Sequence, residues 1–278
     1  MRARSRAIGR GLTVAVPLHR SAPWVPSLAE NLEALPRGTR VLLSDVSRED
    51  DALDQLRRRF RGHRQVRVLR AAPPENTGWR AHWNHLLAHA DTELFAWLPH
   101  DDRITAGYYE RLIEGLSAQP TGALAYGPVV TIGGEFERPQ GHFGRPFAAG
   151  TDLPEYEAVQ LAREWNLGFP IHGVFRRASV RPIPPMPGDR FSDVVWAFGV
   201  ALSGHLIEVD DAIFVKRFHD GTTHTNWEPI TTEQYVEGLA QQIRAGSPVR
   251  DIAPDTEARL HAGFTGAPGH FPPWVAAP

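Results

Sequence analysis

The chain has 278 residues, of which 42% are hydrophobic and 22% charged, and 30 basic residues nearly balance 32 acidic ones. This composition excludes a largely disordered chain, and the near-neutral charge disfavours a nucleic-acid binder that relies on bulk positive charge. The chain has no cysteine, which excludes disulfides, thiolate metal sites and a cysteine nucleophile. No apolar run approaches the roughly 20 residues that span a bilayer, and the basic start lacks a signal-peptide cleavage site. We therefore expect a soluble cytoplasmic protein without an integral membrane segment.

Short apolar runs alternate with helical periods through the first half of the chain. The apolar runs predict strands over residues 12–16, 41–43, 66–69, 94–98 and 123–132. The periodic segments predict helices over residues 27–35, 50–60, 80–90 and 108–116, with Ser27 as the cap of the first. Strands that alternate with helices form parallel sheets through right-handed crossovers, so we expect a layered α/β fold.

The regular alternation ends after Gly133. Residues 133–153 are rich in Gly, Phe and Pro and predict a long loop or hairpin. Beyond it the pattern predicts helices over residues 154–165, 193–202 and 231–245 and a β-rich segment over 206–218. The Pro- and Gly-containing tail from Gly246 is expected to wrap around the fold or to fray.

Polar residues follow the predicted strands at the positions where ligands bind in open parallel sheets. These are the segment after Pro17, Asp45, the loop 73–80 and the Asp101-Asp102 pair. Two adjacent carboxylates repel each other unless a cation lies near, and a divalent ion that also binds substrate phosphates would satisfy them. The alternative is an ordinary turn, in which Asp-Asp is common.

The order of motifs adds a family resemblance. The donor half of family-2 glycosyltransferases with the GT-A fold resembles three segments in this chain: VAVPLHRSAPWV, VLLSDVSRED and ENTGWRAHWNHLLAHADTELFAWLPHDDRITAGYYERL. The second half of that family resembles NLGFPIHGVFRR and FSDVVWAFGVALSGHLIEVDDAIFVKRFH. The resemblance extends from about Leu12 to His219, and it is the order of these motifs that carries it.

The resemblance implies a single α/β domain of the GT-A type, Rossmann-like, with a mostly parallel sheet flanked by helices. Residues 10–132 would bind the donor, residues 133–230 would form the acceptor-binding and catalytic half, and residues 231–278 would add a C-terminal helix and tail. The implied function is inverting transfer of a hexose from a UDP-, dTDP- or GDP-linked donor to a hydroxyl acceptor. The acceptor would be a small molecule, such as a secondary metabolite, or a cell-surface glycan, and Mg²⁺ or Mn²⁺ would assist.

The resemblance also implies roles for particular residues. The donor would contact Pro17, His19, Asp45, Asn76, Gly78, Arg80 and Asp101, with the first three at the base and Arg80 near the phosphates. Asp102 would bind the metal, helped by His219, and Asp193 would be the base that deprotonates the acceptor hydroxyl. Trp196 and His172 are weaker candidates on the acceptor side.

Two departures from the family pattern bear on this expectation. Ser192 stands where the family often has a glutamate before the catalytic aspartate, so one carboxylate remains there. Pro99 and His100 stand where a further aspartate commonly opens the metal motif. Metal binding would then depend mainly on Asp102 and could be weak or dispensable.

Alternative functions remain open from the sequence. The chain could be a catalytically idle nucleotide-sugar-binding protein, or a nucleotidyltransferase, although no glycine-rich, lysine-bearing phosphate loop is present. His82, His85 and His89 share one helix side and could bind zinc, but we favour a half-buried helix whose histidines pack or contact water. Lys216 is the only lysine beside 29 arginines, which disfavours Schiff-base chemistry on lysine. The oligomeric state is left open.

Overall fold

The computed structural model describes residues 11–45, 50–69, 79–133, 153–163, 170–181, 183, 192–219, 231–247 and 251–265. Their centre is a seven-stranded sheet with the order β3-β2-β1-β4-β8-β6-β9, beside a small sheet with the order β5-β10-β7. The strands of the large sheet are β1 (Leu12–Leu18), β2 (Arg40–Asp45), β3 (Val66–Val68), β4 (Leu94–Trp97), β6 (Gly122–Tyr126), β8 (Val174–Arg176) and β9 (His205–Glu208). The small sheet consists of β5 (Arg103–Ile104), β7 (Val129–Ile132) and β10 (Phe214–Arg217).

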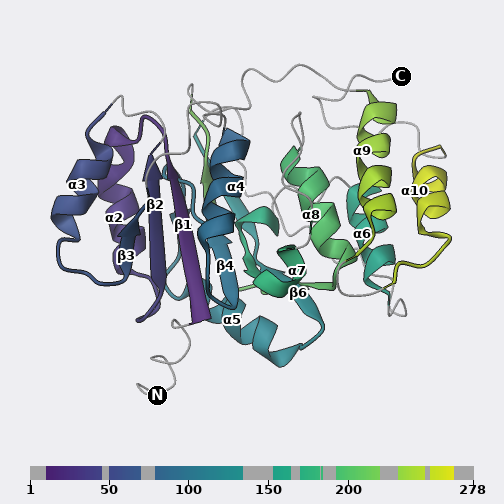
Figure 1. The fold of residues 1–278 in the computed structure, drawn as a ribbon, viewed down its shortest axis with the longest axis horizontal. Helices are drawn as coiled ribbons and strands as arrows, with labels where there is room; N and C mark the ends of the chain where they lie inside the picture. Colours follow the sequence, from purple (N-terminus) through teal and green to yellow (C-terminus); the bar gives the residue numbers. More distant parts are fainter. Residues whose placement is uncertain are drawn as a thin grey trace.

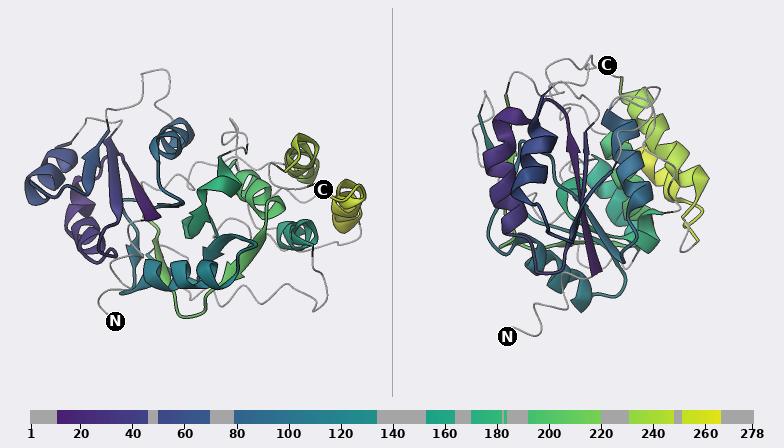
Figure 2. Two further views of the ribbon diagram at one scale, coloured as in Figure 1. Left: turned by 60° about the horizontal axis from the view of Figure 1, so that its bottom comes forward. Right: turned by 60° about the vertical axis from the view of Figure 1, so that its left-hand side comes forward.

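Helices cover both faces of the large sheet (Figures 1 and 2). They are α2 (Val25–Glu33), α3 (Ala52–Arg59), α4 (Trp79–His89), α5 (Tyr108–Ala118), α6 (Pro154–Arg163), α7 (Arg177–Val180), α8 (Ser192–Leu202), α9 (Thr232–Ala245) and α10 (Thr256–Thr265). Two short 3₁₀ helices, η2 (Ala22–Trp24) and η5 (Pro170–His172), precede α2 and β8. None of the helices in the described ranges is long and apolar enough to cross a membrane.

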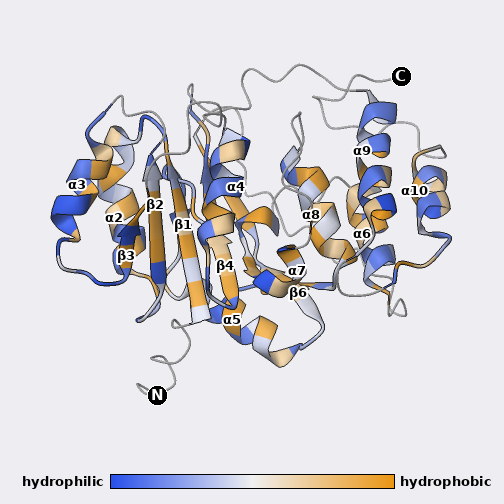
Figure 3. Cartoon of the chain, in the orientation of Figure 1, coloured by the Kyte–Doolittle hydropathy of each residue, from blue (hydrophilic) through white to orange (hydrophobic). Residues whose placement is uncertain are grey.

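Alternating side chains of the central strands supply two separate cores. Along β4, Leu94 and Ala96 pack with α2, α3 and α5, whereas Phe95 and Trp97 pack on the other face with α4, α6 and α8. This period of two is the geometry of a strand buried on both sides. The helix α8 is apolar all round and every residue except Asp193 is buried, so Figure 3 shows it largely orange. The outward faces of α3 and α9 are blue in the same view.

The predicted α/β fold and the elements of its first half are confirmed, with local corrections. The first helix begins at Val25 rather than after Ser27, and the Ser27 hydroxyl instead donates to the Trp24 carbonyl oxygen at 3.0 Å. The segment predicted as one strand over 123–132 is two strands in different sheets. Strand β8 is antiparallel to both its neighbours, and the predicted loose tail contains the helix α10. The loop predicted over 133–153 lies almost wholly outside the described residues.

The break between β6 and β7 lies at Gly127, where the chain passes very close to another segment. A Cβ atom at this position would collide with the carbonyl group of Ala212, which leads into β10. We expect Gly127→Ala to lower the free energy of unfolding by about 2 kcal/mol or more, because backbone must move to admit the methyl group. Chemical denaturation measures this. Gly11→Ala is the matched control, since no atom lies within 4 Å of its Cβ position. Equal, small effects of the two substitutions would contradict the packing described here.

Candidate active site

The carboxyl ends of β1, β2 and β4 meet at one edge of the large sheet. β1 runs parallel to β2 with Leu18 opposite Asp45, and parallel to β4 with Ala15 opposite Trp97. The chain leaving β4 stays against β1, because His100 Nδ1 lies 3.2 Å from the Pro17 carbonyl oxygen. The predicted base-side residues and the aspartate pair are therefore brought to the same edge, as expected for ligand sites in open α/β sheets.

The aspartate pair is held by β10, a strand more than a hundred residues away in sequence. Asp102 is fully buried, and its Oδ2 accepts a hydrogen bond from Lys216 Nζ at 2.9 Å. The other oxygen, Oδ1, accepts from the backbone N–H of Arg217 at 2.8 Å. His219 Nε2 lies 3.0 Å from Asp101 Oδ2. The end of β10 thus brings three basic residues to the two carboxylates.

Two further side chains fix this arrangement. Asn31 on α2 is buried, and its amide donates to the Asp102 carbonyl oxygen at 2.9 Å and accepts from the Ile104 N–H at 3.2 Å. Arg217 Nε donates to the Asp101 carbonyl oxygen at 3.0 Å, while its guanidinium lies 4.8 Å from the centre of the Trp24 ring. The turn after β4 is consequently fixed to both α2 and β10.

Burial and the neighbouring charges act against each other in this cluster. Burial raises the pKa of Asp102, and the Lys216 ammonium opposes that rise. Burial acts in the same direction on Asp101, but Lys216 and His100 outweigh it and hold the pKa of Asp101 below its usual range. For Lys216, burial alone would lower the pKa, yet Asp102 and Asp101 together raise it. Lys216 is therefore a permanent cation at neutral pH.

Asp193 lies in the first turn of α8, where the helix dipole favours a carboxylate. Burial raises its pKa to about 6, against the opposing effect of backbone N–H groups and of the Lys216 charge. Within the described ranges its buried Oδ1 has no hydrogen-bond partner. A carboxylate with a raised pKa and an unused oxygen is suited to accept a proton.

The residues predicted to contact the donor differ in how exposed they are. Pro17 and Asp45 are buried at the edge, His19 is exposed and Arg80 is half-buried in the first turn of α4, whereas Asn76 and Gly78 lie outside the described residues. The sequence suggested His82 only as part of a possible zinc face, and the structure places it 2% exposed beside this edge. Burial, with smaller effects from His85, His19 and His100, lowers the pKa of His82 to about 4, so the ring is neutral.

The acceptor-side candidates are not surface groups in this structure. Trp196 is 1% exposed and packs against Trp97 and Phe175, with ring centres 4.9 and 5.3 Å away. His172 is 7% exposed and stacks on Phe214 at 4.3 Å. Both rings pack in the core of this structure, because α8 and η5 turn them towards the sheet, and their roles on the acceptor side stay predictions.

A divalent ion fits this donor set poorly. Both oxygens of Asp102 are engaged by Lys216 and Arg217, and His219 is directed at Asp101 rather than at Asp102. No group of three or more His, Cys, Asp or Glu side chains that could hold a metal occurs among the residues the structure describes. The three histidines His82, His85 and His89, for which zinc was the less favoured alternative, lie within these described residues, and His89 Nδ1 lies 2.8 Å from the His85 carbonyl oxygen.

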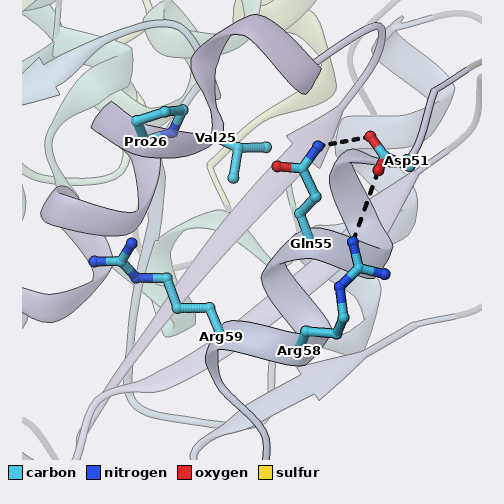
Figure 4. Close-up of a pocket in the computed structure, with 6 residues that line it drawn as sticks. All are labelled: Val25, Pro26, Asp51, Gln55, Arg58 and Arg59. Carbon is cyan, nitrogen blue, oxygen red and sulfur yellow. Dashed lines mark hydrogen bonds and ion pairs between the residues drawn. The ribbon is translucent and has the colours of Figure 1, made fainter.

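A surface groove of about 470 Å³ lies between α2 and α3 (Figure 4). It is lined by Val25, Pro26, Asp51, Gln55, Arg58 and Arg59. Asp51 lies 3.7 Å from Arg58, and Glu33 lies 2.8 Å from Arg59, so both arginines already have anionic partners. The groove contains none of the predicted site residues, and we place the candidate site at the sheet edge.

Comparison with known proteins identifies the family of the chain. The family model described as glycosyl transferase family 2 matches residues 13–179, more than half of the chain. A search of curated protein sequences found no match. The matched segment includes β1, β2, β4 and the aspartate pair, whereas β10 and α8 lie beyond it.

Solved structures share the fold at low sequence identity. TarS residues 1–349 from S. aureus, in complex with UDP-GlcNAc, superposes with a TM-score of 0.66 at 14% identity, covering 91% of this chain and 70% of that one. The mannosyltransferase PcManGT from Pyrobaculum calidifontis, in complex with GDP-Man and Mn²⁺, gives a TM-score of 0.59 at 17% identity, with 91% and 68% covered. A longer TarS chain is covered over 42% of its length. The predicted GT-A fold is thereby confirmed.

Proposed function

Because the chain belongs to glycosyl transferase family 2, we propose that it transfers a sugar from a nucleotide-diphosphate sugar to a hydroxyl group, with inversion at the anomeric carbon. The observation that carries the proposal is the presence of both required chemistries near one sheet edge. Asp101, Asp102 and the basic end of β10 form a charged cluster for a diphosphate, and Lys216 also acts electrostatically on Asp193. A carboxylate of raised pKa that is electrostatically coupled to this cluster is a good candidate for the base.

The proposed reaction is a single displacement. Asp193 takes the proton of the acceptor hydroxyl as its oxygen attacks the anomeric carbon, and the nucleoside diphosphate leaves from the opposite face. One base facing the leaving group gives one displacement and hence inversion. The Oδ1 of Asp193, which has no hydrogen-bond partner among the described residues, is the atom proposed to receive the proton. The buried cluster keeps the leaving diphosphate in a region where charges act strongly.

The transferred group is proposed to be a hexose. The structural neighbours were solved with UDP-GlcNAc and with GDP-Man, both nucleotide-linked hexoses, which supports this choice. Mg²⁺ or Mn²⁺ was expected from the family, and one neighbour was solved with Mn²⁺. Since the carboxylate of Asp102 is already occupied by Lys216 and Arg217, no step of the proposed reaction depends on a metal ion. The acceptor class and the cytoplasmic location stay predictions.

Calorimetric titration with UDP, dTDP and GDP, followed by a donor-turnover assay with the matching nucleotide sugars, tests the proposal. We expect one base to bind clearly better than the others, and slow release of its nucleoside diphosphate when water replaces the acceptor. Binding without any turnover would favour the alternative that the chain is a catalytically idle nucleotide-sugar-binding protein, which the presence of Ser192 before Asp193 leaves open. Absence of binding to all three nucleotides, with and without Mn²⁺, would contradict the proposed function.

A further inference from the structure

The single lysine of the chain occupies a position where a cation is chemically required. The other 29 Lys and Arg residues are all arginine, yet the residue facing the buried Asp102 is Lys216. Its side chain is 14% exposed, whereas that of Asp102 is 0% exposed. The Lys216 side chain is therefore not fully enclosed, whereas the Asp102 carboxylate is, so of the two only the lysine can be reached by a ligand.

An ammonium group has hydrogen-bonding capacity left after binding one carboxylate. It carries three N–H donors, and within the described residues its one hydrogen-bond partner is Asp102 Oδ2 at 2.9 Å. Arginine in this position would present a planar fork that pairs with a carboxylate through two of its nitrogens. A compact ammonium can instead bind Asp102 through one N–H and direct the others towards a second anion.

The charges around Lys216 leave a place for that anion. Asp102 is balanced by Lys216, and Asp101 faces His219 at 3.0 Å. Arg217 adds a further positive charge, which is held over Trp24 and bound to a neutral carbonyl oxygen rather than to a carboxylate. The end of β10 thus places the cationic side chains of Lys216 and Arg217 beside the turn after β4, where a diphosphate group would accept hydrogen bonds from them.

We propose that Lys216 binds the diphosphate of the donor directly and supplies the positive charge for which a divalent ion was expected. This inference rests on the proposed function, since it concerns the donor site of that same reaction. It differs from the sequence prediction in one respect: Asp102 holds Lys216 in position and is not a metal ligand. Donor binding should consequently need no divalent metal.

The test is a calorimetric titration with the nucleoside and the nucleoside diphosphate of the preferred base, in EDTA and in Mn²⁺. For the wild-type protein we expect the diphosphate to bind in EDTA within about threefold of its affinity in Mn²⁺. Lys216→Met should weaken diphosphate binding by about 10- to 100-fold, the size expected for charge-assisted hydrogen bonds, and leave nucleoside binding unchanged. Arg103 lies on the neighbouring strand β5 and pairs with the exposed Glu30, so Arg103→Met is the matched control. It should change neither the affinity for the nucleoside diphosphate nor that for the nucleoside.

Lys216→Met leaves Asp102 buried without its partner and could impair folding. A second pair of variants, in which Asp102 is replaced by the neutral asparagine, avoids this problem. Asp102→Asn alone keeps the ammonium and should bind the diphosphate in EDTA at least as tightly as wild type. The double variant Asp102→Asn/Lys216→Met should lose 10- to 100-fold in diphosphate affinity relative to Asp102→Asn, as expected for the loss of charge-assisted hydrogen bonds.

Three outcomes would overturn the inference. The first is wild-type diphosphate binding that requires Mn²⁺, and the second is unchanged affinity in both lysine variants. In these cases the nucleoside still binds and the proposed function stands. The third is failure of the nucleoside and the diphosphate to bind wild type at all, which overturns both the inference and the proposed function.

Discussion

Asp193→Asn is expected to lower the rate of sugar transfer by about a thousandfold, the range measured for removal of a general base. The affinity for the nucleoside diphosphate should change by less than about twofold, because the base acts on the acceptor and not on the donor. Asparagine has nearly the same shape but cannot take up the proton. The effect should therefore appear in kcat rather than in KM for the donor.

The pH dependence of the wild-type enzyme follows from the same carboxylate. Burial raises the pKa of Asp193 to about 6, so the base is protonated, and the rate falls, as the pH drops below that value.

The free energy of unfolding changes with pH in the opposite direction. Because the folded state holds this proton more tightly than the unfolded state, stability falls between about pH 3.8 and pH 6 as the pH rises. Asp193→Asn should then stabilise the protein above pH 6, by on the order of 1 kcal/mol.

Donor turnover against pH, together with thermal unfolding at about pH 7.5 and about pH 4, measures these effects. Asp211→Asn is the matched control, because that carboxylate is 73% exposed and pairs with Arg111 at the surface. It should leave the rate and the acid limb of the pH profile unchanged. If Asp193→Asn retained more than a tenth of the wild-type rate, Asp193 would not be the base.

Trp97→Ala is expected to lower the free energy of unfolding by about 4 kcal/mol. The Trp97 side chain is fully buried and lies at the centre of an aromatic cluster. Its ring centre is within 5.5 Å of those of Trp83, Phe95, Phe175 and Trp196. Truncation would remove this apolar area and leave a cavity between the large sheet, α4 and α8. As α8 carries Asp193, the loss should reduce activity as well as stability.

The matched variant for this position is Trp97→Phe. Within the described residues the indole Nε1 is buried without a hydrogen-bond partner, so phenylalanine removes no polar contact and keeps most of the packing. We expect Trp97→Phe to lower the free energy of unfolding by less than about 1.5 kcal/mol. Denaturant titration of both variants provides the comparison. A cost for Trp97→Ala no larger than that for Trp97→Phe would show that this cluster does not form the core described here.

Much of the fold could be predicted because its signals are local. The apolar runs of β1 and β4 and the helical period of α5 lie within single segments, and each was found close to its observed bounds. The single strand predicted over 123–132 was wrong because an apolar run does not reveal a change of sheet. Gly127 and Pro128 were the local signal for it, since this pair marks turns. Helix α10 was missed because the Pro and Gly residues around it favoured a loose tail.

The site was only partly predictable because its partners are far apart in sequence. Asp102 could be found from its position after a strand, but its contact with Lys216 depends on β10 pairing with β5. Lys216 was noticed as the only lysine, without a place in the site. Asn31 had a local signal, as a polar residue on the apolar stripe of α2. The burial of Trp196 could not be predicted, because an all-apolar helix does not indicate which of its side chains face solvent.

The most direct test of the account is a crystal structure of the protein with the nucleoside diphosphate that binds best, grown in EDTA. The account predicts that the diphosphate lies at the carboxyl edge of β1 and β4, within about 3 Å of Lys216 Nζ, with Asp193 facing the space where the sugar would be attached. A nucleotide bound in the groove between α2 and α3, or bound at the edge with Lys216 still directed only at Asp102, would contradict it.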